Sequence, residues 1–141
     1  MHLNINIEKD AFIIFSVSRS DKNEFENMWR SHAAATALDT LNIPFERVEG
    51  VYKGTPEASF LIGPEHRQAA IHLAALFGQE SILVKYSERR EEGPNQVLLV
   101  GPSTELDILA ALGAWSKVTK EEAKKLDNYS MIAGNYYTTK L

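Results

Sequence analysis

The first third of the chain changes from a strand-like apolar run to a helical spacing. Residues 11–18 are mostly apolar, β-branched or aromatic, which predicts a buried strand. Ser20 or Asp21 is a candidate N-cap, and Glu24 stands three positions after Asp21, as in a capping box. We expect one apolar helix face to carry Phe25, Met28, Trp29 and His32, continued by Leu38 and Leu41. Pro44 disfavours the helical conformation in the residue before it and ends this helix.

The middle of the chain predicts further strands around a second helix. Pro64 near a first helical position and Glu65 in the first turn are typical of a helix N-terminus. Gly78 is the expected C-terminal cap of that helix. The strands are expected at residues 45–53, 57–62, 81–86 and 96–100.

The last forty residues have a weaker pattern. Ser103 is a candidate cap for a short helix ending at Leu112, and Thr119 with Glu122 repeats the capping-box spacing. The predicted order is therefore β-α-β-β-α-β-β followed by a short helical C-terminal appendage. This order predicts an α+β fold with a ferredoxin-like β-α-β-β-α-β sheet and one added strand. Since we find no linker or low-complexity segment, residues 1–141 are expected to form a single domain.

Composition excludes several classes of protein. The chain has 141 residues with 15 basic and 19 acidic side chains, giving a net charge of −4, so we expect no nucleic-acid partner. Without cysteine there is no disulfide, thiolate metal site or cysteine nucleophile. No apolar run approaches the ~20 residues of a membrane span, and acidic residues interrupt the N-terminal stretch where a signal peptide would be apolar. We expect a soluble cytoplasmic protein without a membrane partner.

Few side chains have the spacing of a reactive centre. The four histidines do not fall at metal-ligand spacings, so no metal site is predicted. Tyr52 and Glu57 flank a tight connection between two strands, and Gln79 and Glu80 precede the next strand of the sheet. An aromatic ring near carboxylates is suited to an organic cation. On spacing by itself, a packing role for Tyr52 and a solvated Glu57 is the simpler interpretation.

An ordered set of short segments resembles a known enzyme family. The segments are Phe15-Ser16-Val17-Ser18-Arg19-Ser20, Asn27-Met28 with Arg30, Gly50-Val51-Tyr52, Pro56-Glu57 and Phe77-Gly78-Gln79-Glu80-Ser81-Ile82-Leu83-Val84. In this order they resemble phage-encoded S-adenosylmethionine lyases, long called S-adenosylmethionine hydrolases. The resemblance covers residues 12–100, with a weaker similarity at 129–137. The loop between Tyr52 and Glu57 is shorter than in that family.

The resemblance implies cleavage of S-adenosylmethionine to 5′-methylthioadenosine and homoserine lactone without a metal or cofactor. It also implies a homotrimer with sites between subunits, acting in the host bacterial cytoplasm as a phage counter-defence (anti-restriction) enzyme. Tyr52 matches the family tyrosine and would lie near the sulfonium, and Glu57 matches a glutamate that would contact the substrate's polar groups. Gln79 and Glu80 would contact the ribose or adenine. Ser20 and Arg30 are candidates for binding the methionine moiety.

Two alternatives without catalysis stay open. The segments 57–60 and 77–79 also resemble a small bacterial family of unknown function. Apart from this second resemblance, the alternatives are a non-catalytic ferredoxin-like module that binds a small metabolite and a protein-interaction or anti-restriction factor that acts by contact. Formation of methylthioadenosine from S-adenosylmethionine separates the lyase from both.

Overall fold

The computed structural model describes residues 3–79, 81–86, 96–100 and 108–140. Its strands are β1 (Phe12–Ser16), β2 (Glu46–Tyr52), β3 (Thr55–Ile62), β4 (Ile82–Lys85), β5 (Gln96–Val100), β6 (Ile108–Val118), β7 (Tyr129–Ile132) and β8 (Asn135–Lys140). Its helices are α1 (Glu24–Thr40), α2 (Arg67–Leu76), which follows a single 3₁₀ turn (Pro64–His66), and α3 (Lys120–Ala123). In the described part of the chain, no helix has the length and apolar character needed to cross a membrane.

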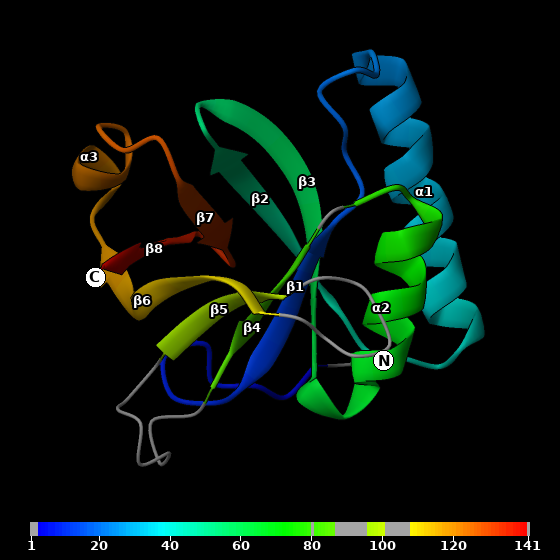
Figure 1. The fold of residues 1–141 in the computed structure, drawn as a ribbon, viewed down its shortest axis with the longest axis horizontal. Coiled ribbons are helices and arrows are strands. Elements are labelled where there is room, and N and C mark those ends of the chain that lie inside the picture. Colours follow the sequence, from blue (N-terminus) through cyan, green and yellow to red (C-terminus); the bar gives the residue numbers. More distant parts are fainter. Residues whose placement is uncertain (1–2, 80, 87–95, 101–107, 141) are drawn as a thin grey trace.

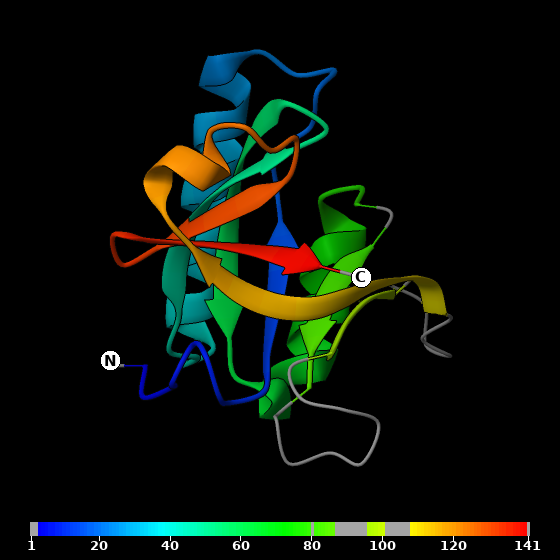
Figure 2. The same ribbon diagram turned by 90° about the vertical axis from the view of Figure 1, so that its left-hand side faces the viewer.

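The strands form one closed antiparallel sheet in the order β1-β3-β2-β7-β8-β6-β5-β4, with β4 pairing back onto β1. Helices α1 and α2 lie beside each other against the outside of this sheet, and α3 lies on the opposite side of the molecule (Figure 1). Figure 2, turned by 90°, shows β6 and β8 crossing in front of β1 and β3. The α+β class is therefore confirmed.

The C-terminal third differs from the sequence prediction. The sequence predicts a ferredoxin-like sheet with one added strand and a helical appendage. In the structure, β5, β6, β7 and β8 instead connect the two edges of the β4-β1-β3-β2 sheet and close it into a barrel. Residues 108–112 belong to β6, not to a helix. Their Ala and Leu residues favour a helix locally, but they pair with the edge of β5. Residues 114–118 of the same strand pair with β8, so β6 joins two sheet edges. The short helix α3 does begin with the predicted Thr119–Glu122 capping box.

Helix α1 is rotated relative to the prediction. Phe25, Met28 and Trp29 are 66–78% exposed, whereas Ser31, Ala34, Ala35 and Leu38 are buried. Small residues on the buried face allow the helix axis to approach the sheet closely, which outweighs burial of the larger stripe. The N-cap is Asn23, whose side chain accepts a hydrogen bond from the Glu26 N–H, and not Ser20 or Asp21.

Alternation along β1 separates two apolar cores. Ile13 and Phe15 face α1 and α2, while Phe12 and Ile14 point into the barrel, where they join a second cluster that includes Trp115. The N-terminal segment 3–10 packs against the barrel cluster at one end. There the fully buried Lys85 ammonium donates hydrogen bonds to the carbonyl oxygens of residues 8 and 10, at 3.2 and 2.7 Å. The other end of the barrel holds a cavity.

Candidate active site

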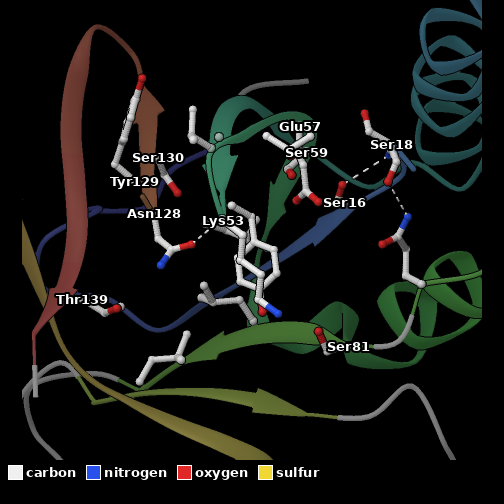
Figure 3. Close-up of a pocket in the computed structure, with 18 of the residues that line it drawn as sticks. Ser16, Ser18, Lys53, Glu57, Ser59, Ser81, Asn128, Tyr129, Ser130 and Thr139 are labelled. Atoms are coloured by element: carbon white, nitrogen blue, oxygen red, sulfur yellow. Dashed lines mark hydrogen bonds between the residues drawn. The ribbon is translucent and has the colours of Figure 1, made fainter. Parts of the chain in front are cut away.

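The cavity has a volume of about 500 Å³ and opens at the end of the barrel away from the buried Lys85. Its walls come from β1, β2, β3, β4, β6, β7 and β8 together with the segments that precede α1 and follow α2. Serine, threonine and asparagine side chains surround its mouth (Figure 3). These polar residues are Ser16, Ser18, Ser20, Thr55, Ser59, Ser81, Asn128, Ser130, Thr138 and Thr139. A cavity of this size suits a nucleoside-sized ligand.

The barrel interior changes from apolar to polar at one level across several strands. On β1 the inward position changes from Ile14 to Ser16, and on β3 from Leu61 to Ser59 and Glu57. Because Ser16 pairs with Ser59, these polar residues lie at one height in the barrel. On β7, Ile132 belongs to the barrel core, whereas Ser130, two residues earlier, lines the cavity. Because inward positions recur at every second residue of a strand, β1, β3 and β7 each present an apolar side chain to the barrel core and a polar one to the cavity.

Glu57 is the central charged group of the cavity. Burial raises the pKa of its carboxyl, and a hydrogen bond with the Ser16 hydroxyl partly offsets this effect. Among the residues that the structure describes, Glu57 has no salt-bridge partner. Asp21, the other acidic group of the described lining, is held by Arg19 at 2.9 Å, and this contact lowers its pKa. Glu57 is therefore the carboxylate that a bound cation would neutralise.

The β2–β3 turn forms the rim of the cavity beside Glu57. Tyr52 is 43% exposed, and the Lys53 ammonium lies 5.4 Å from the centre of its ring. The Lys53 N–H donates to Asn128 Oδ1 at 2.8 Å, and the Gly54 N–H donates to the Asp127 carbonyl at 3.0 Å. These bonds fix the turn to the segment before β7, so Tyr52 has a defined place at the mouth.

An aromatic pair forms the inner wall of the cavity. Trp115 stacks on Tyr137 with ring centres 5.3 Å apart and an interplanar angle of 12°. Burial and the Glu8 carboxylate both raise the pKa of Tyr137, so its phenol stays neutral. The indole Nε1 of Trp115 is buried without a hydrogen-bond partner among the described residues. The site therefore combines a polar mouth with an aromatic wall.

The structure brings together most of the residues predicted for the site. Tyr52, Glu57, Gln79 and Ser20 line the cavity. Arg30 is not part of the lining, because its guanidinium bonds the carbonyl oxygens of Val17 and Phe77. Glu80 lies outside the described residues.

Sequence reasoning missed the part of the site that comes from the C-terminal strands. Asn128, Ser130, Trp115 and Tyr137 reach the cavity only because the barrel closes. The tyrosines at positions 129, 136 and 137 indicate that the C-terminal tail is ordered, but they do not indicate where it packs. No cluster of three His, Cys, Asp or Glu side chains suited to a metal occurs in the part of the chain that the structure describes.

Residues 13–140 match the family model of the S-adenosylmethionine lyase family. No curated protein matches the chain significantly. The match includes β6, which carries Trp115 and lies outside the ranges 12–100 and 129–137 in which the sequence resembles the family. The chain belongs to the S-adenosylmethionine lyase family.

Proposed function

We propose that this chain cleaves S-adenosylmethionine in the barrel cavity to 5′-methylthioadenosine and homoserine lactone. The observation that carries the proposal is Glu57, a partly buried carboxylate without a salt-bridge partner among the described residues, in a cavity of nucleoside size. S-adenosylmethionine is a nucleoside with two cationic groups, an ammonium and a sulfonium. Family membership supports the lyase activity.

In the proposed reaction the substrate supplies its own nucleophile. A carboxylate oxygen forms a bond to the γ-carbon, the γ-carbon–sulfur bond breaks, and its electron pair stays on sulfur. A lactone and a neutral thioether result, and no proton moves. Opposite charges cancel along this path, so water stabilises the substrate more than the transition state. A cavity that excludes water and folds the methionine chain back on itself accelerates the step.

We assign roles to the predicted site residues, starting from the substrate charge that persists through the reaction. The α-ammonium keeps its charge throughout, so Glu57 is assigned to it, because a carboxylate there binds substrate and transition state equally. The Tyr52 ring is assigned to the sulfonium at the mouth, an interaction of about 0.5–1 kcal/mol at an exposed site. Gln79 and Glu80 are assigned to the nucleoside, and Ser20 to the methionine carboxylate. No metal or cofactor takes part in this scheme.

The assembly and biological role are part of the same proposal. We propose a homotrimer that acts in the host bacterial cytoplasm, where removing the methyl donor blunts methylation-dependent defence against a phage. The exposed Phe25, Met28 and Trp29 on α1 offer apolar surface for association. Light scattering of the purified protein should give three times the chain mass. A monomeric mass in solution would contradict the proposed homotrimer.

The deciding experiment analyses the products made in ¹⁸O-labelled water with EDTA present. Cleavage should give methylthioadenosine and homoserine lactone at an undiminished rate. When the lactone later opens, water attacks its carbonyl, so the label enters the carboxylate of homoserine. Label in the γ-hydroxyl would instead show hydrolysis at the γ-carbon, and absence of methylthioadenosine would overturn the lyase proposal.

A further inference from the structure

The C-terminal end of α2 is held by two arginines at the point where the chain enters the cavity. Gly78 has φ +70°, and the N–H groups of Gly78 and Gln79 donate to the carbonyls of Ala75 and Ala74, at 3.0 and 2.8 Å. This Schellman arrangement ends the helix, as Gly78 predicts. The carbonyls of residues 77 and 78 then accept hydrogen bonds from outside the helix. Arg30 donates to the first and Arg19 to the second, the latter at 2.6 Å.

The same contacts join this helix end to the end of β1. Arg30 Nε donates to the Val17 carbonyl at 2.7 Å, and its guanidinium lies 5.1 Å from the centre of the Phe77 ring. Gln79, two residues after Phe77, donates from its side-chain Nε2 to the carbonyl of Ser18, the residue after Val17, at 2.9 Å. The segment that follows β1 and the C-terminal end of α2 are thus joined by two side chains, those of Arg30 and Gln79.

These bonds fix the orientation of the Gln79 amide. Since a carbonyl oxygen only accepts, the Gln79 NH₂ group must face Ser18, and the amide oxygen must face away from it. Gln79 lines the cavity, and Arg30 does not. The guanidinium is permanently charged and has donors on several nitrogens, which allows Arg30 to bond two carbonyls at once.

We propose that Arg30 is a positioning residue, which together with Arg19 holds the Gly78–Gln79 segment so that the Gln79 amide oxygen is presented to a bound nucleoside. This inference rests on the proposed function for the identity of the ligand, but not for the geometry. Arg30 then influences ligand binding by positioning Gln79, without contacting the substrate itself.

The geometry is tested first on the ligand-free protein, by NMR of the ¹⁵N-labelled Gln79 side-chain amide, identified by its loss in Gln79→Ala. Arg30→Met should move this signal toward the position of a free amide. Arg30→Lys keeps the charge but replaces the separate Nε and Nη2 donors by a single nitrogen, so it should have an effect smaller than that of Arg30→Met. Arg47→Met is the matched control, because Arg47 also lies over a phenylalanine ring, 5.3 Å from Phe60, and outside the cavity lining.

The effect on binding is tested by a double-mutant cycle on the dissociation constant of methylthioadenosine. Arg30→Met should weaken binding about tenfold in the wild-type background and have little further effect in Gln79→Ala. Equal effects in both backgrounds would overturn the proposal, as would an unchanged Gln79 signal in Arg30→Met. Because the NMR result needs no ligand, a protein that neither binds nor cleaves the substrate would refute the proposed function separately.

Discussion

Gly50 and Glu57 lie directly opposite each other in the β2–β3 ladder, and both line the cavity. Directly opposed residues point to the same face of a sheet, so a side chain at position 50 would stand beside the Glu57 carboxylate. A Cβ at Gly50 would have the carbonyl oxygens of Glu57 and Tyr129 as its nearest neighbours, both at 3.7 Å. A side chain at position 50 would therefore be compatible with the neighbouring backbone, but it would occupy part of the cavity volume.

Enlarging position 50 should reduce ligand binding without unfolding the protein. We expect Gly50→Ala to fold with a nearly unchanged melting temperature, because 3.7 Å is ordinary van der Waals contact. Gly50→Leu should fill the space beside Glu57 and raise the KM for S-adenosylmethionine tenfold or more. Steady-state kinetics and thermal denaturation on both variants provide the measurement. An unchanged KM in Gly50→Leu would place the substrate elsewhere.

Removing the charge of Glu57 should lower activity without destabilising the fold. We expect Glu57→Gln to reduce kcat/KM at least tenfold, which corresponds to about 1.4 kcal/mol of transition-state stabilisation. The folded-state pKa of Glu57 is raised, so its ionised form opposes folding above that pKa, and the melting temperature at neutral pH should stay the same or rise. Glu49→Gln, one position earlier than Gly50 and exposed outside the cavity, is the matched control. Equal activities of the two variants would remove Glu57 from the site.

The dependence of activity on pH should show a single acidic limb. The raised pKa of Glu57 means that its charge is lost at a higher pH than for an ordinary glutamate, so kcat/KM should fall as the pH drops through that value. No proton moves in the proposed reaction, and the profile should stay flat through neutrality. In Glu57→Gln the acidic limb should disappear. A bell-shaped profile centred near pH 7 would indicate general acid–base catalysis instead.

Tyr52 should act through its ring and not through its hydroxyl. Tyr52→Phe keeps the aromatic face at the mouth, so we expect activity within about threefold of wild type. Tyr52→Ala removes the face and should raise KM several-fold, in line with about 0.5–1 kcal/mol for an exposed cation–π contact. Because Tyr52 is 43% exposed, neither change should lower the melting temperature much. A larger loss in Tyr52→Phe than in Tyr52→Ala would contradict this role.

Ligand binding should be visible in the fluorescence of Trp115. The chain has two tryptophans, of which Trp29 is exposed on α1 and Trp115 forms the cavity wall. In Trp29→Phe, emission reports on Trp115 by itself, and methylthioadenosine should change it in a saturable manner. The same titration of Trp115→Phe, which keeps Trp29, should show no saturable change. A response from Trp29 and none from Trp115 would place the ligand outside the barrel.

The sequence by itself determined the local elements of the first two thirds of the chain. Apolar runs, Pro64 and Gly78 predicted the strands and the second helix, and the order of short segments predicted the family that the match over residues 13–140 then showed. It also placed Tyr52, Glu57, Gln79 and Ser20 in one site, and all four line the cavity. Local propensity and capping depend mostly on neighbouring residues, which was sufficient for Gly78 and for the Thr119–Glu122 box but not for the N-cap of α1, which is Asn23.

Only the tertiary structure decided how the sheet closes and which faces are buried. Residues 108–112 contain helix-favouring Ala and Leu, yet they lie in β6, where they pair with β5 while residues 114–118 of the same strand pair with β8. Arg30 has the spacing of a family motif, but its hydrogen bonds to Val17 and Phe77 depend on residues 13 and 47 positions away. The aromatic wall of Trp115 and Tyr137 likewise depends on the pairing of β6 with β8. Such contacts are set by the free energy of long-range pairing and burial, which spacing along the chain does not encode.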